Sequence, residues 1–306
     1  MKIHTGLPQF VAEISSNHNR SLDRCIQFLD KAAEIGCSAA KFQLFKIDQL
    51  FAPEILERSE EHRRRKAWEL PVSFLPDLAA RCRQKGIHFG CTPFYLKAVE
   101  ELLPFVDFYK IASYELPWHD LLRACGRTGK PIILSTGMAT MDEVRAAVNV
   151  LKNSGCKDLT LLHCVSAYPT PAAECNLSAI KTFYTAFGNK PSSMSLHFGW
   201  SDHSVSPAVI YRAVHRWNAE LIEFHLDLDG RGEEYASGHC WLPDTIRQVI
   251  QSVRFGFEAD GNGRKTPPPS ELSDRDWRSD PHDGLRPVMK TREEWRRLTA
   301  RKAYDR

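Results

Sequence analysis

Two lysines interrupt apolar stretches that otherwise have the composition of buried strands: Lys41 in AAKFQLFK and Lys110 in DFYKIAS. Burying an ammonium group without a partner is costly, so two such lysines near one site require anions. Hydroxyl side chains of the kind that complete an anion cradle follow neighbouring runs, namely Thr92, Ser113, Ser135 and Ser201. This combination predicts a bound phosphate or carboxylate. The alternative is that the lysines form purely structural pairs with glutamates inside the fold.

Two histidines, His203 in GWSDHS and His225 in IEFHLDL, end consecutive apolar runs. Neutral imidazoles at adjacent strand ends can bind a divalent metal and leave coordination positions open for water or substrate. Asp202 and Asp227 flank these runs and are the expected partners of the second ring nitrogens. We therefore predict a divalent metal site, whereas a single histidine in such a place is usually a hydrogen-bonded core residue.

Glu13 and Glu115 are the candidates for proton transfer. A carboxylate in a partly dry cavity beside lysines and a metal can have its pKa shifted so that it exchanges protons near neutral pH. The alternative for both is simple ion pairing. Because these glutamates cannot be the only partners of the lysines and also free catalysts, an external anion would resolve the charge balance.

Eight short apolar runs carry these residues at or near their carboxyl ends, and helix-patterned stretches follow them. The runs span 9–15, 39–45, 87–92, 108–113, 131–136, 159–165, 192–198 and 220–226. Strands that alternate with helices favour an α/β fold with a parallel sheet, and eight of them close most naturally into a (β/α)8 TIM barrel. Sites in such barrels lie at the carboxyl ends of the strands, where these lysines, hydroxyls, histidines and glutamates fall.

The chain has 306 residues, 42% of them hydrophobic, which suits one barrel of about 250 residues with an extension. We predict a catalytic barrel at 1–260 and, beginning with GNGRKTPPPS, a linker and C-terminal extension at 261–306. The net charge of +3 gives no sign of a nucleic-acid or membrane partner. The sequence has no signal-peptide core and no membrane-spanning apolar stretch, so we expect a cytoplasmic protein.

Helical periodicity is clearest at 21–36, 140–155 and 205–219. The stretch 51–73 breaks the alternation of strands and helices and holds the charge cluster ERSEEHRRRK at 57–66. Its arginines would be able to clamp an anionic substrate, but opposite charges at helical spacing favour a solvated helix face. Nine scattered cysteines without CxxC spacing are expected to be reduced thiols in or near the core.

The motifs AEISSNHNRSLD, KFQLFK, FGCTPF, YKIASYE, LSTGM, LHCVSAYPTP, WSDH and EFHLDLD resemble, in this order, those of the sialic acid synthase family. Its members are phosphoenolpyruvate-condensing barrel enzymes that make N-acetylneuraminate and related nonulosonic acids. The resemblance runs from Val11 to Asp229, and YKIAS, LSTGM and WSDH together are highly specific. It implies a transferase that condenses phosphoenolpyruvate with an N-acylated amino sugar such as N-acetylmannosamine and releases phosphate by C–O cleavage.

The resemblance also implies roles for single residues. The residues that bind phosphoenolpyruvate in the family correspond to Lys41, Thr92, Lys110, Ser113, Ser135 and Ser201. Gln43 and Tyr168 correspond to residues that contact the amino sugar.

The implied catalytic carboxylates are Glu13 and Glu115. Glu13 is the candidate for activating water and Glu115 for handling the proton of the sugar hydroxyl, and these two assignments are interchangeable. His203 and His225 correspond to ligands of Mn²⁺, with Mg²⁺ and Co²⁺ as alternatives.

Three features depart from the family pattern. Ser166 stands where members often have Asn near the phosphate. After the eighth run the chain reads GRGEEYASGHCWLP in place of a GPDH-like segment, so the candidates for the sugar-binding carboxylate are Asp229, Glu233 and Glu234.

The third departure is that the chain resembles a short form without the C-terminal antifreeze-like domain. In longer members an arginine of that domain reaches the acyl group of the sugar in a partner subunit. Either Arg278 or Arg286 replaces that arginine, or the substrate has no such need. The dimer of the longer members uses the same domain, and we expect a homo-oligomer here as well.

Two other functions are compatible with these residues. Lys41 or Lys110, desolvated in a barrel, would be able to act as the nucleophile of a Schiff-base aldolase or lyase, which would leave the histidine pair idle. Borohydride trapping with pyruvate distinguishes that mechanism. The other possibility is a non-catalytic paralogue that binds its ligands without turnover.

Overall fold

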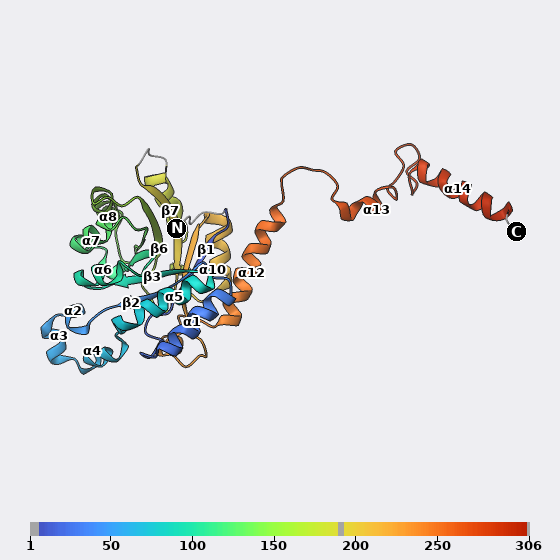
Figure 1. The fold of residues 1–306 in the computed structure, drawn as a ribbon. Helices are drawn as coiled ribbons and strands as arrows, with labels where there is room; N and C mark the ends of the chain where they lie inside the picture. The colour runs from blue at the N-terminus through green and yellow to red at the C-terminus, as the bar shows by residue number, and fades with distance from the viewer. Residues whose placement is uncertain (1–5, 189–192, 305–306) are drawn as a thin grey trace. The chain divides into compact units, whose positions relative to one another are not determined.

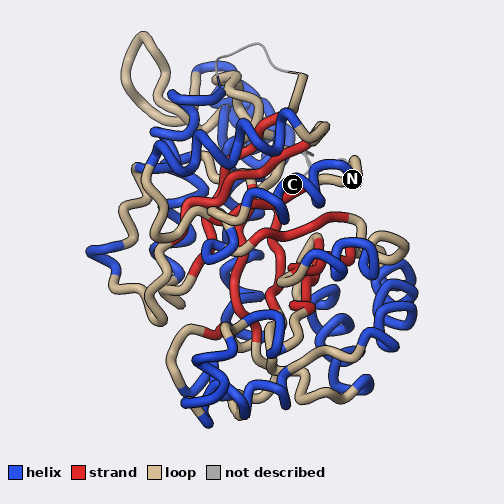
Figure 2. Tube along the Cα trace, turned by 90° about the vertical axis from the view of Figure 1, so that its left-hand side faces the viewer, coloured by secondary structure: helices blue, strands red, loops and turns tan. Residues whose placement is uncertain are grey.

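Eight parallel strands form a closed barrel in the computed structural model, which describes residues 6–188 and 193–304, with side chains to residue 298. The strands are β1 (Gln9–Glu13), β2 (Ala39–Leu44), β3 (His88–Pro93), β4 (Phe108–Ile111), β5 (Ile132–Ser135), β6 (Asp158–Cys164), β7 (Ser195–Asp202) and β8 (Leu221–Leu226). Each pairs with the next, and pairing of β8 with β1 closes the ring. The strands lie inside and the helices outside (Figure 2). The predicted (β/α)8 barrel is confirmed.

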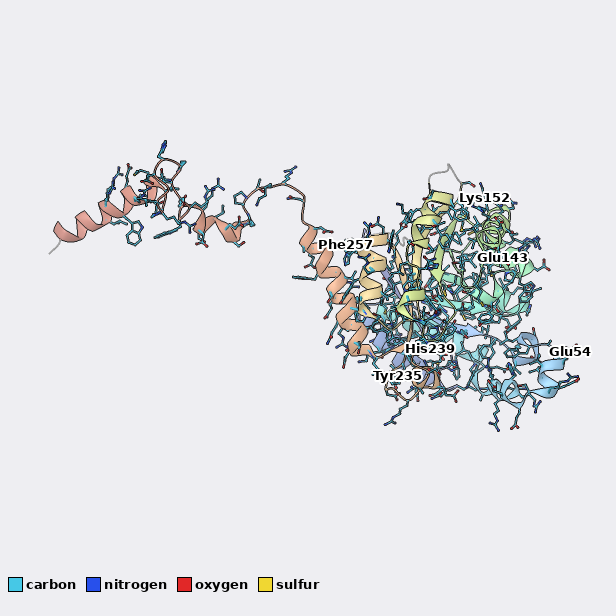
Figure 3. The ribbon with its side chains drawn as sticks, turned by 180° about the vertical axis from the view of Figure 1, so that it is seen from behind. Glu54, Glu143, Lys152, Tyr235, His239 and Phe257 are labelled. Carbon is cyan, nitrogen blue, oxygen red and sulfur yellow. The ribbon has the colours of Figure 1, made fainter. Side chains whose placement is uncertain are left out.

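Helices between the strands cover the outside of the barrel (Figure 1). They are α1 (Leu22–Glu34), α5 (Leu75–Lys85), α6 (Leu96–Leu102), α7 (His119–Arg127), α8 (Met141–Asn153), α9 (Ala179–Phe183), α10 (Pro207–Tyr211) and α12 (Pro243–Asp260). The side chains of Ser21 and Thr140 cap α1 and α8, as their types predict. The expected third helix is α10, which continues as a π-helix over Arg212–Arg216. Exposed Glu143 and Lys152 lie near the two ends of α8 (Figure 3).

The segment between β2 and α5 is built from short helices. They are α2 (Ile47–Leu50), α3 (Pro53–Arg58), α4 (Glu60–Arg64) and 3₁₀ turns at Arg65–Trp68 and Val72–Phe74. Arg64 pairs with Glu60 at 2.7 Å, and Arg65 pairs with Glu61 at 3.3 Å, each four residues apart. The charge cluster is therefore a solvated helix surface with internal ion pairs, as its spacing predicts.

Two apolar layers build the barrel, because successive side chains of a strand point to opposite faces. The outward layer packs against the helices and includes Phe10, Phe42, Phe89, Trp200 and Phe224. A separate inward cluster fills the barrel and consists of Val11, Ala39, Phe108, Ile133, Leu162 and Leu221. The barrel interior is thus packed beneath the site.

Gly90 of β3 makes room for the largest side chain of this inward cluster. A Cβ atom at Gly90 would lie 2.1 Å from the ring of Phe108, which is fully buried. We expect Gly90→Ala to lower the free energy of unfolding by about 1–3 kcal/mol through overpacking, measured by urea denaturation. Gly188→Ala is the matched control, because a Cβ there meets its nearest neighbour at 3.5 Å. Equal stabilities of the two variants would contradict this account of the interior.

Two strand assignments differ from the sequence-based expectation. Strand β7 begins at Ser195 and continues to Asp202, so that His203 follows it directly; position 192, the expected start, lies outside the described residues. A short ninth strand, β9 (Cys240–Trp241), pairs in parallel with the end of β8 and was not expected. Two residues carry too little periodicity to be recognised as a strand, and pairing with β8 is what makes them one.

The chain divides into two compact units, residues 1–257 and 258–306. The second unit contains a 3₁₀ turn at Pro269–Glu271, α13 (Leu272–Arg275) and α14 (Met289–Tyr304). Within it, the rings of Trp277 and Trp295 lie edge to face with centroids 6.0 Å apart. None of the described helices combines the length and the apolar character needed to cross a membrane.

Candidate active site

The polar residues of the site follow the inward apolar cluster toward the carboxyl ends of the strands. Residues two positions further along a strand share its face. Starting from Val11, Ala39, Phe108, Ile133, Leu162 and Leu221, this step leads to Glu13, Lys41, Lys110, Ser135, Cys164 and Glu223. The same strands that fill the barrel with apolar side chains therefore place charged groups at its carboxyl end.

A cavity of about 210 Å³ opens at this end of the barrel. It is lined by ten of the residues that the sequence predicts for the site: Glu13, Lys41, Gln43, Thr92, Lys110, Ser113, Ser135, Tyr168, His203 and His225. The predicted residues Glu115 and Ser201 are not among its lining residues. A larger hollow of about 600 Å³ lies between α6 and α7 and contains none of the predicted residues. The smaller cavity is therefore the candidate site.

Glu223 of β8, which the sequence reasoning missed, lies at the centre of the charges. Its carboxylate oxygens are 3.4 Å from Lys110 Nζ and 3.9 Å from Lys41 Nζ, and Ser201 donates a hydrogen bond to it at 3.1 Å. Burial opposes its ionisation, but the two ammonium groups outweigh burial and lower the pKa of Glu223 to about 2. Strand alternation in IEFHLDL gives the signal, since Glu223 shares a face with His225.

Lys41 forms a second buried pair, with Glu13 on the neighbouring strand. Its Nζ also lies 3.4 Å from Thr92 Oγ1. Burial lowers the pKa of Lys41 to about 8. The structural pairing of lysines with glutamates is therefore present, and both ammonium groups nevertheless line the cavity.

Small hydroxyl and amide groups surround the lysines. Ser113 Oγ accepts a hydrogen bond from Gly137 N at 2.9 Å and lies 3.7 Å from Cys164 Sγ. The buried hydroxyls of Ser135 and Ser166 have no hydrogen-bond partner among the described residues. A Cβ at Gly137 would lie 2.2 Å from Ser166 Oγ. The unpaired hydroxyl of Ser135, which lines the cavity together with both ammonium groups, suits an anion with several oxygens.

Glu115 follows β4 in a 3₁₀ turn, Ser113–Glu115. Burial raises the pKa of Glu115 to about 7, against the opposing influence of Lys110. Its Oε2 atom is buried without a hydrogen-bond partner among the described residues. A carboxyl group with these properties can exchange protons near neutral pH.

His203 and His225 lie side by side at the cavity, with ring centroids 5.3 Å apart. His203 Nδ1 contacts the carbonyl oxygen of Val165 at 2.9 Å, and His225 Nδ1 contacts Glu234 Oε2 at 2.8 Å. These contacts fix both rings and leave the Nε2 atoms as the ligand atoms, the usual arrangement of metal-binding histidines. His203 is also hydrogen-bonded to Cys164, a contact that a metal ion would replace. The donor set fits a divalent ion.

The expectation that Asp202 and Asp227 orient these histidines is wrong. Asp202 accepts hydrogen bonds from the indole nitrogens of Trp200 at 3.0 Å and Trp241 at 2.9 Å. Asp227 accepts from the backbone nitrogens of Leu228 and Gly232 and pairs with Arg24. The partners that hold the histidines are the carbonyl of Val165 and the carboxylate of Glu234.

The two predicted sugar contacts, Gln43 and Tyr168, both line the cavity. The Tyr168 ring packs against His203 with centroids 4.2 Å apart, and Gln43 Nε2 donates to Ser15 Oγ at 3.3 Å.

The three candidate carboxylates after β8 differ in their surroundings. Glu234 contacts His225, Asp229 pairs with Arg24 at 3.2 Å, and Glu233 is exposed. Arg278 and Arg286 belong to the second unit, where they contact the Arg275 carbonyl and Ser279. A role for either arginine at the sugar stays a prediction.

Comparison with known proteins gives consistent matches over most of the chain. The NeuB family profile matches residues 28–265. An uncharacterized protein of Methanocaldococcus jannaschii is 35% identical over 87% of this chain and 76% of its own length. N,N'-diacetyllegionaminic acid synthase of Legionella pneumophila is 31% identical over 86% of this chain and 76% of its own. The crystal structure of N-acetylneuraminic acid synthetase from Leptospira borgpetersenii superposes with a TM-score of 0.76 at 29% identity, covering 88% of this chain and 90% of that one.

Proposed function

Because the chain belongs to the NeuB family, we propose that it joins phosphoenolpyruvate to an N-acylated amino sugar, giving a nonulosonic acid and phosphate. The chain is an enzyme of the synthase type, like its named relatives. The observation that carries the proposal is the convergence of Lys41, Lys110 and the hydroxyls on one cavity beside the pair His203 and His225.

Phosphoenolpyruvate carries a phosphate and a carboxylate, and the site offers donors for both. Lys41 and Lys110 supply charge, and Thr92, Ser113 and Ser135 supply hydroxyl donors around them. Ser201 acts differently from the others, because its hydroxyl donates to Glu223. We propose that Glu223 pairs with both lysines while the substrate takes up the remaining donor positions. Gln43 and Tyr168 are the proposed contacts of the amino sugar.

In the proposed reaction, carbon 3 of phosphoenolpyruvate forms a bond with the aldehyde carbon of the open-chain sugar. Water adds at carbon 2, and phosphate leaves when its C–O bond breaks. Glu13 accepts one proton of the water, and the second proton passes to the departing phosphate as carbon 2 becomes a ketone. Glu115 donates a proton to the oxygen of the former aldehyde. The lysines stabilise negative charge on the phosphate as it leaves. A divalent ion at His203 and His225, for which we propose Mn²⁺, supplies Lewis-acid polarisation of the aldehyde oxygen.

The raised pKa of Glu115 predicts a specific pH dependence. Its carboxyl group is protonated below its pKa of about 7, so turnover should fall as the pH rises through this value. In Glu115→Gln, which cannot donate a proton as an acid does, we expect turnover to fall by about 10²–10⁴-fold. The part of the alkaline limb near pH 7 should disappear, which leaves only the fall expected when Lys41, with a pKa of about 8, loses its charge. Steady-state phosphate release from pH 5 to 9 measures both effects. An unchanged alkaline limb in the variant would remove Glu115 from the acid role.

A second candidate function rests on Lys41, whose pKa of about 8 is favourable for a Schiff-base nucleophile. Such an aldolase or lyase would form a covalent imine with pyruvate. Treatment with borohydride and pyruvate, followed by mass spectrometry of the intact chain, detects this adduct. Labelling of Lys41 or Lys110 would support the Schiff-base mechanism and contradict the condensation reaction.

The direct test is a phosphate-release assay with phosphoenolpyruvate, Mn²⁺ and a panel of N-acylated hexosamines and diacetamido sugars. We expect release that requires both phosphoenolpyruvate and one member of the panel, with one nonulosonic acid formed per phosphate. Release without any sugar would contradict the reaction. Binding of both ligands without release would favour the non-catalytic alternative.

A further inference from the structure

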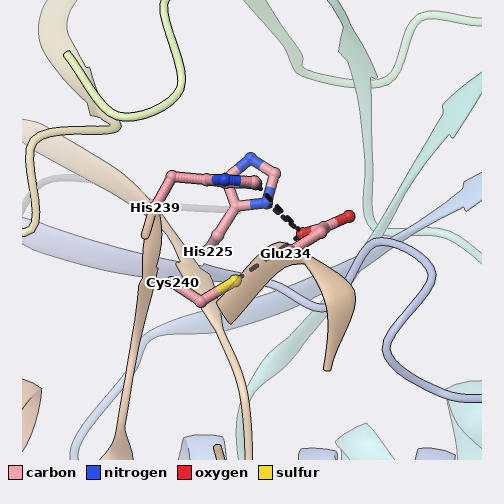
Figure 4. Close-up of side chains that lie close together, drawn as sticks. All are labelled: His225, Glu234, His239 and Cys240. Atoms are coloured by element: carbon pink, nitrogen blue, oxygen red, sulfur yellow. Dashed lines mark hydrogen bonds and ion pairs between the residues drawn. The ribbon is translucent and has the colours of Figure 1, made fainter. Parts of the chain in front are cut away.

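Four potential metal ligands meet where the chain leaves β8 and returns as β9. They are His225 of β8, Glu234 of the short helix α11 (Glu233–Ala236), Cys240, which begins β9, and His239, which directly precedes β9. One ligand atom from each lies within 4.8 Å of the others. Figure 4 shows the four side chains pointing toward one another.

One carboxylate oxygen, Glu234 Oε2, is the meeting point. It lies 2.8 Å from His225 Nδ1, 3.6 Å from His239 Nε2 and 3.7 Å from Cys240 Sγ. His239 and Cys240 are 7% and 3% exposed, so water contributes little to their surroundings. The other ring nitrogen of His239 is buried and has no hydrogen-bond partner among the described residues. The four side chains, which offer electron pairs to a metal ion, therefore lie close together and largely shielded from water.

The backbone around the cluster is held in place from several sides. Asn17 Nδ2 donates to the Leu226 carbonyl at 3.1 Å, and the Asp227 carboxylate accepts from Gly232 N at 2.9 Å. A Cβ at Gly232 would lie 2.5 Å from Asn17 Oδ1, so the loop passes closely over Asn17. The pairing of His225 with Cys240 in the strand register fixes the two ends of the cluster. The ligands are therefore preorganised by contacts outside the cluster.

We propose that His225, Glu234, His239 and Cys240 form a tetrahedral site for a zinc-type divalent ion, a second site that shares only His225 with the pair His203 and His225. Two imidazoles, a thiolate and a carboxylate are the ligand types that zinc takes, and a thiolate disfavours Mg²⁺ and Mn²⁺. Bond lengths of about 2.0–2.3 Å place tetrahedral ligand atoms roughly 3.3–3.8 Å apart. The four atoms now lie at most 4.8 Å apart, so on binding an ion the wider separations shorten and the 2.8 Å contact between His225 Nδ1 and Glu234 Oε2 lengthens.

The shared ligand His225 gives this site a regulatory consequence, which rests on the proposed function. An imidazole that binds an ion through one nitrogen commonly carries its proton on the other. An ion in the four-residue cluster binds Nδ1, which faces Glu234, and leaves the proton on Nε2. Nε2 of His225 can then no longer bind a catalytic ion together with His203. Zinc in the cluster and a catalytic ion at the pair therefore exclude each other, and zinc inhibits the enzyme.

Cobalt spectroscopy of the metal-free full chain tests the site without any assay of activity. We expect one equivalent of Co²⁺ to give a thiolate-to-cobalt absorption band in the near ultraviolet together with the visible bands of tetrahedral Co²⁺. In Cys240→Ser the thiolate band should disappear, whereas Cys125→Ser, which changes a buried cysteine of α7, should keep it. Absence of the band from the wild-type protein, or its persistence in Cys240→Ser, would overturn the proposal.

Zinc affinity provides a second readout, measured by competition with a chromogenic chelator. His239→Gln and Cys240→Ser should each weaken Zn²⁺ binding by at least about tenfold, and Cys125→Ser should change it by less than about twofold. Far-UV circular dichroism identifies variants that fail to fold. An equal affinity for Zn²⁺ in all four proteins would contradict the ligand set even if folding is unaffected.

Inhibition by zinc tests the consequence at His225. With Mn²⁺ present, Zn²⁺ should suppress phosphate release in the wild-type protein, and Cys240→Ser should need at least about tenfold more Zn²⁺ for the same inhibition. Equal inhibition of both proteins would contradict competition for His225. If no sugar supports phosphate release, the proposed function fails, while the cobalt spectrum still decides whether the cluster binds metal.

Discussion

Replacing Lys110 with methionine should lower kcat/KM for phosphate release by about 10³-fold, which corresponds to about 4 kcal/mol of transition-state stabilisation. Lys110 is buried at the cavity, and its ammonium group lies 3.4 Å from Glu223. In a site shielded from water, a fixed positive charge stabilises a leaving phosphate far more than it would in solution. Methionine keeps the length of the side chain and removes its charge. Steady-state phosphate release at saturating sugar measures the effect.

The matched control is Lys97→Met on α6, where the lysine is exposed and pairs with Glu100. We expect its kcat/KM to stay within about twofold of the wild type, since exposed pairs contribute little. Lys110→Met also leaves Glu223 with one ammonium partner fewer, which costs stability when the carboxylate is buried. The double variant Lys110→Met with Glu223→Gln removes both charges. If the stably folded double variant retained wild-type kcat/KM, Lys110 would have no role in catalysis.

Replacing His203 with alanine should abolish the dependence of turnover on added metal and lower the rate by more than about 100-fold. Even residues that only orient metal ligands change affinity or activity by about 10–100-fold, and a ligand itself should exceed this. His203 is the informative choice because His225 also belongs to the proposed zinc cluster. Phosphate release as a function of Mn²⁺ measures the loss. The electron paramagnetic resonance signal of free Mn²⁺ measures binding independently of turnover.

His88→Ala is the control for this experiment. His88 begins β3 at the opposite end of the barrel, where it is partly exposed beside Asp107. Its replacement should leave both Mn²⁺ binding and turnover within about twofold of the wild type. If His203→Ala bound Mn²⁺ as tightly as the wild type, the assignment of His203 as a ligand would be wrong.

The barrel and most of the cavity lining were predictable because the two signals are local. A lysine inside an apolar run, as at Lys41 and Lys110, marks a strand position where the desolvation of the ammonium group must be offset by an ion pair or a bound ligand. The end of such a run marks the carboxyl end of a strand, where barrel sites lie. Both signals involve only neighbouring residues, so they can be recognised in the sequence without knowledge of the fold.

The partners of the histidines were less predictable, and the error at Asp202 has a clear physical cause. Asp202 precedes His203 in the sequence, and successive side chains along a strand point to opposite faces. Asp202 therefore faces outward to Trp200 and Trp241, and the sequence neighbour of the histidine is not its partner. The same alternation, applied to β8, would have identified Glu223 from the position of His225.

The amino-acid sequence by itself determined the architecture and the kinds of chemical group at the barrel mouth, because alternation and apolar patterning act over a few residues. Only the tertiary structure decided which groups meet. The register of the strands pairs Glu13 with Lys41 and Glu223 with Lys110. The pairing of β9 with β8 brings His239 and Cys240 to His225. The contacts of His239 and Cys240 depend on the path of the loop between β8 and β9, and no local pattern encodes that path.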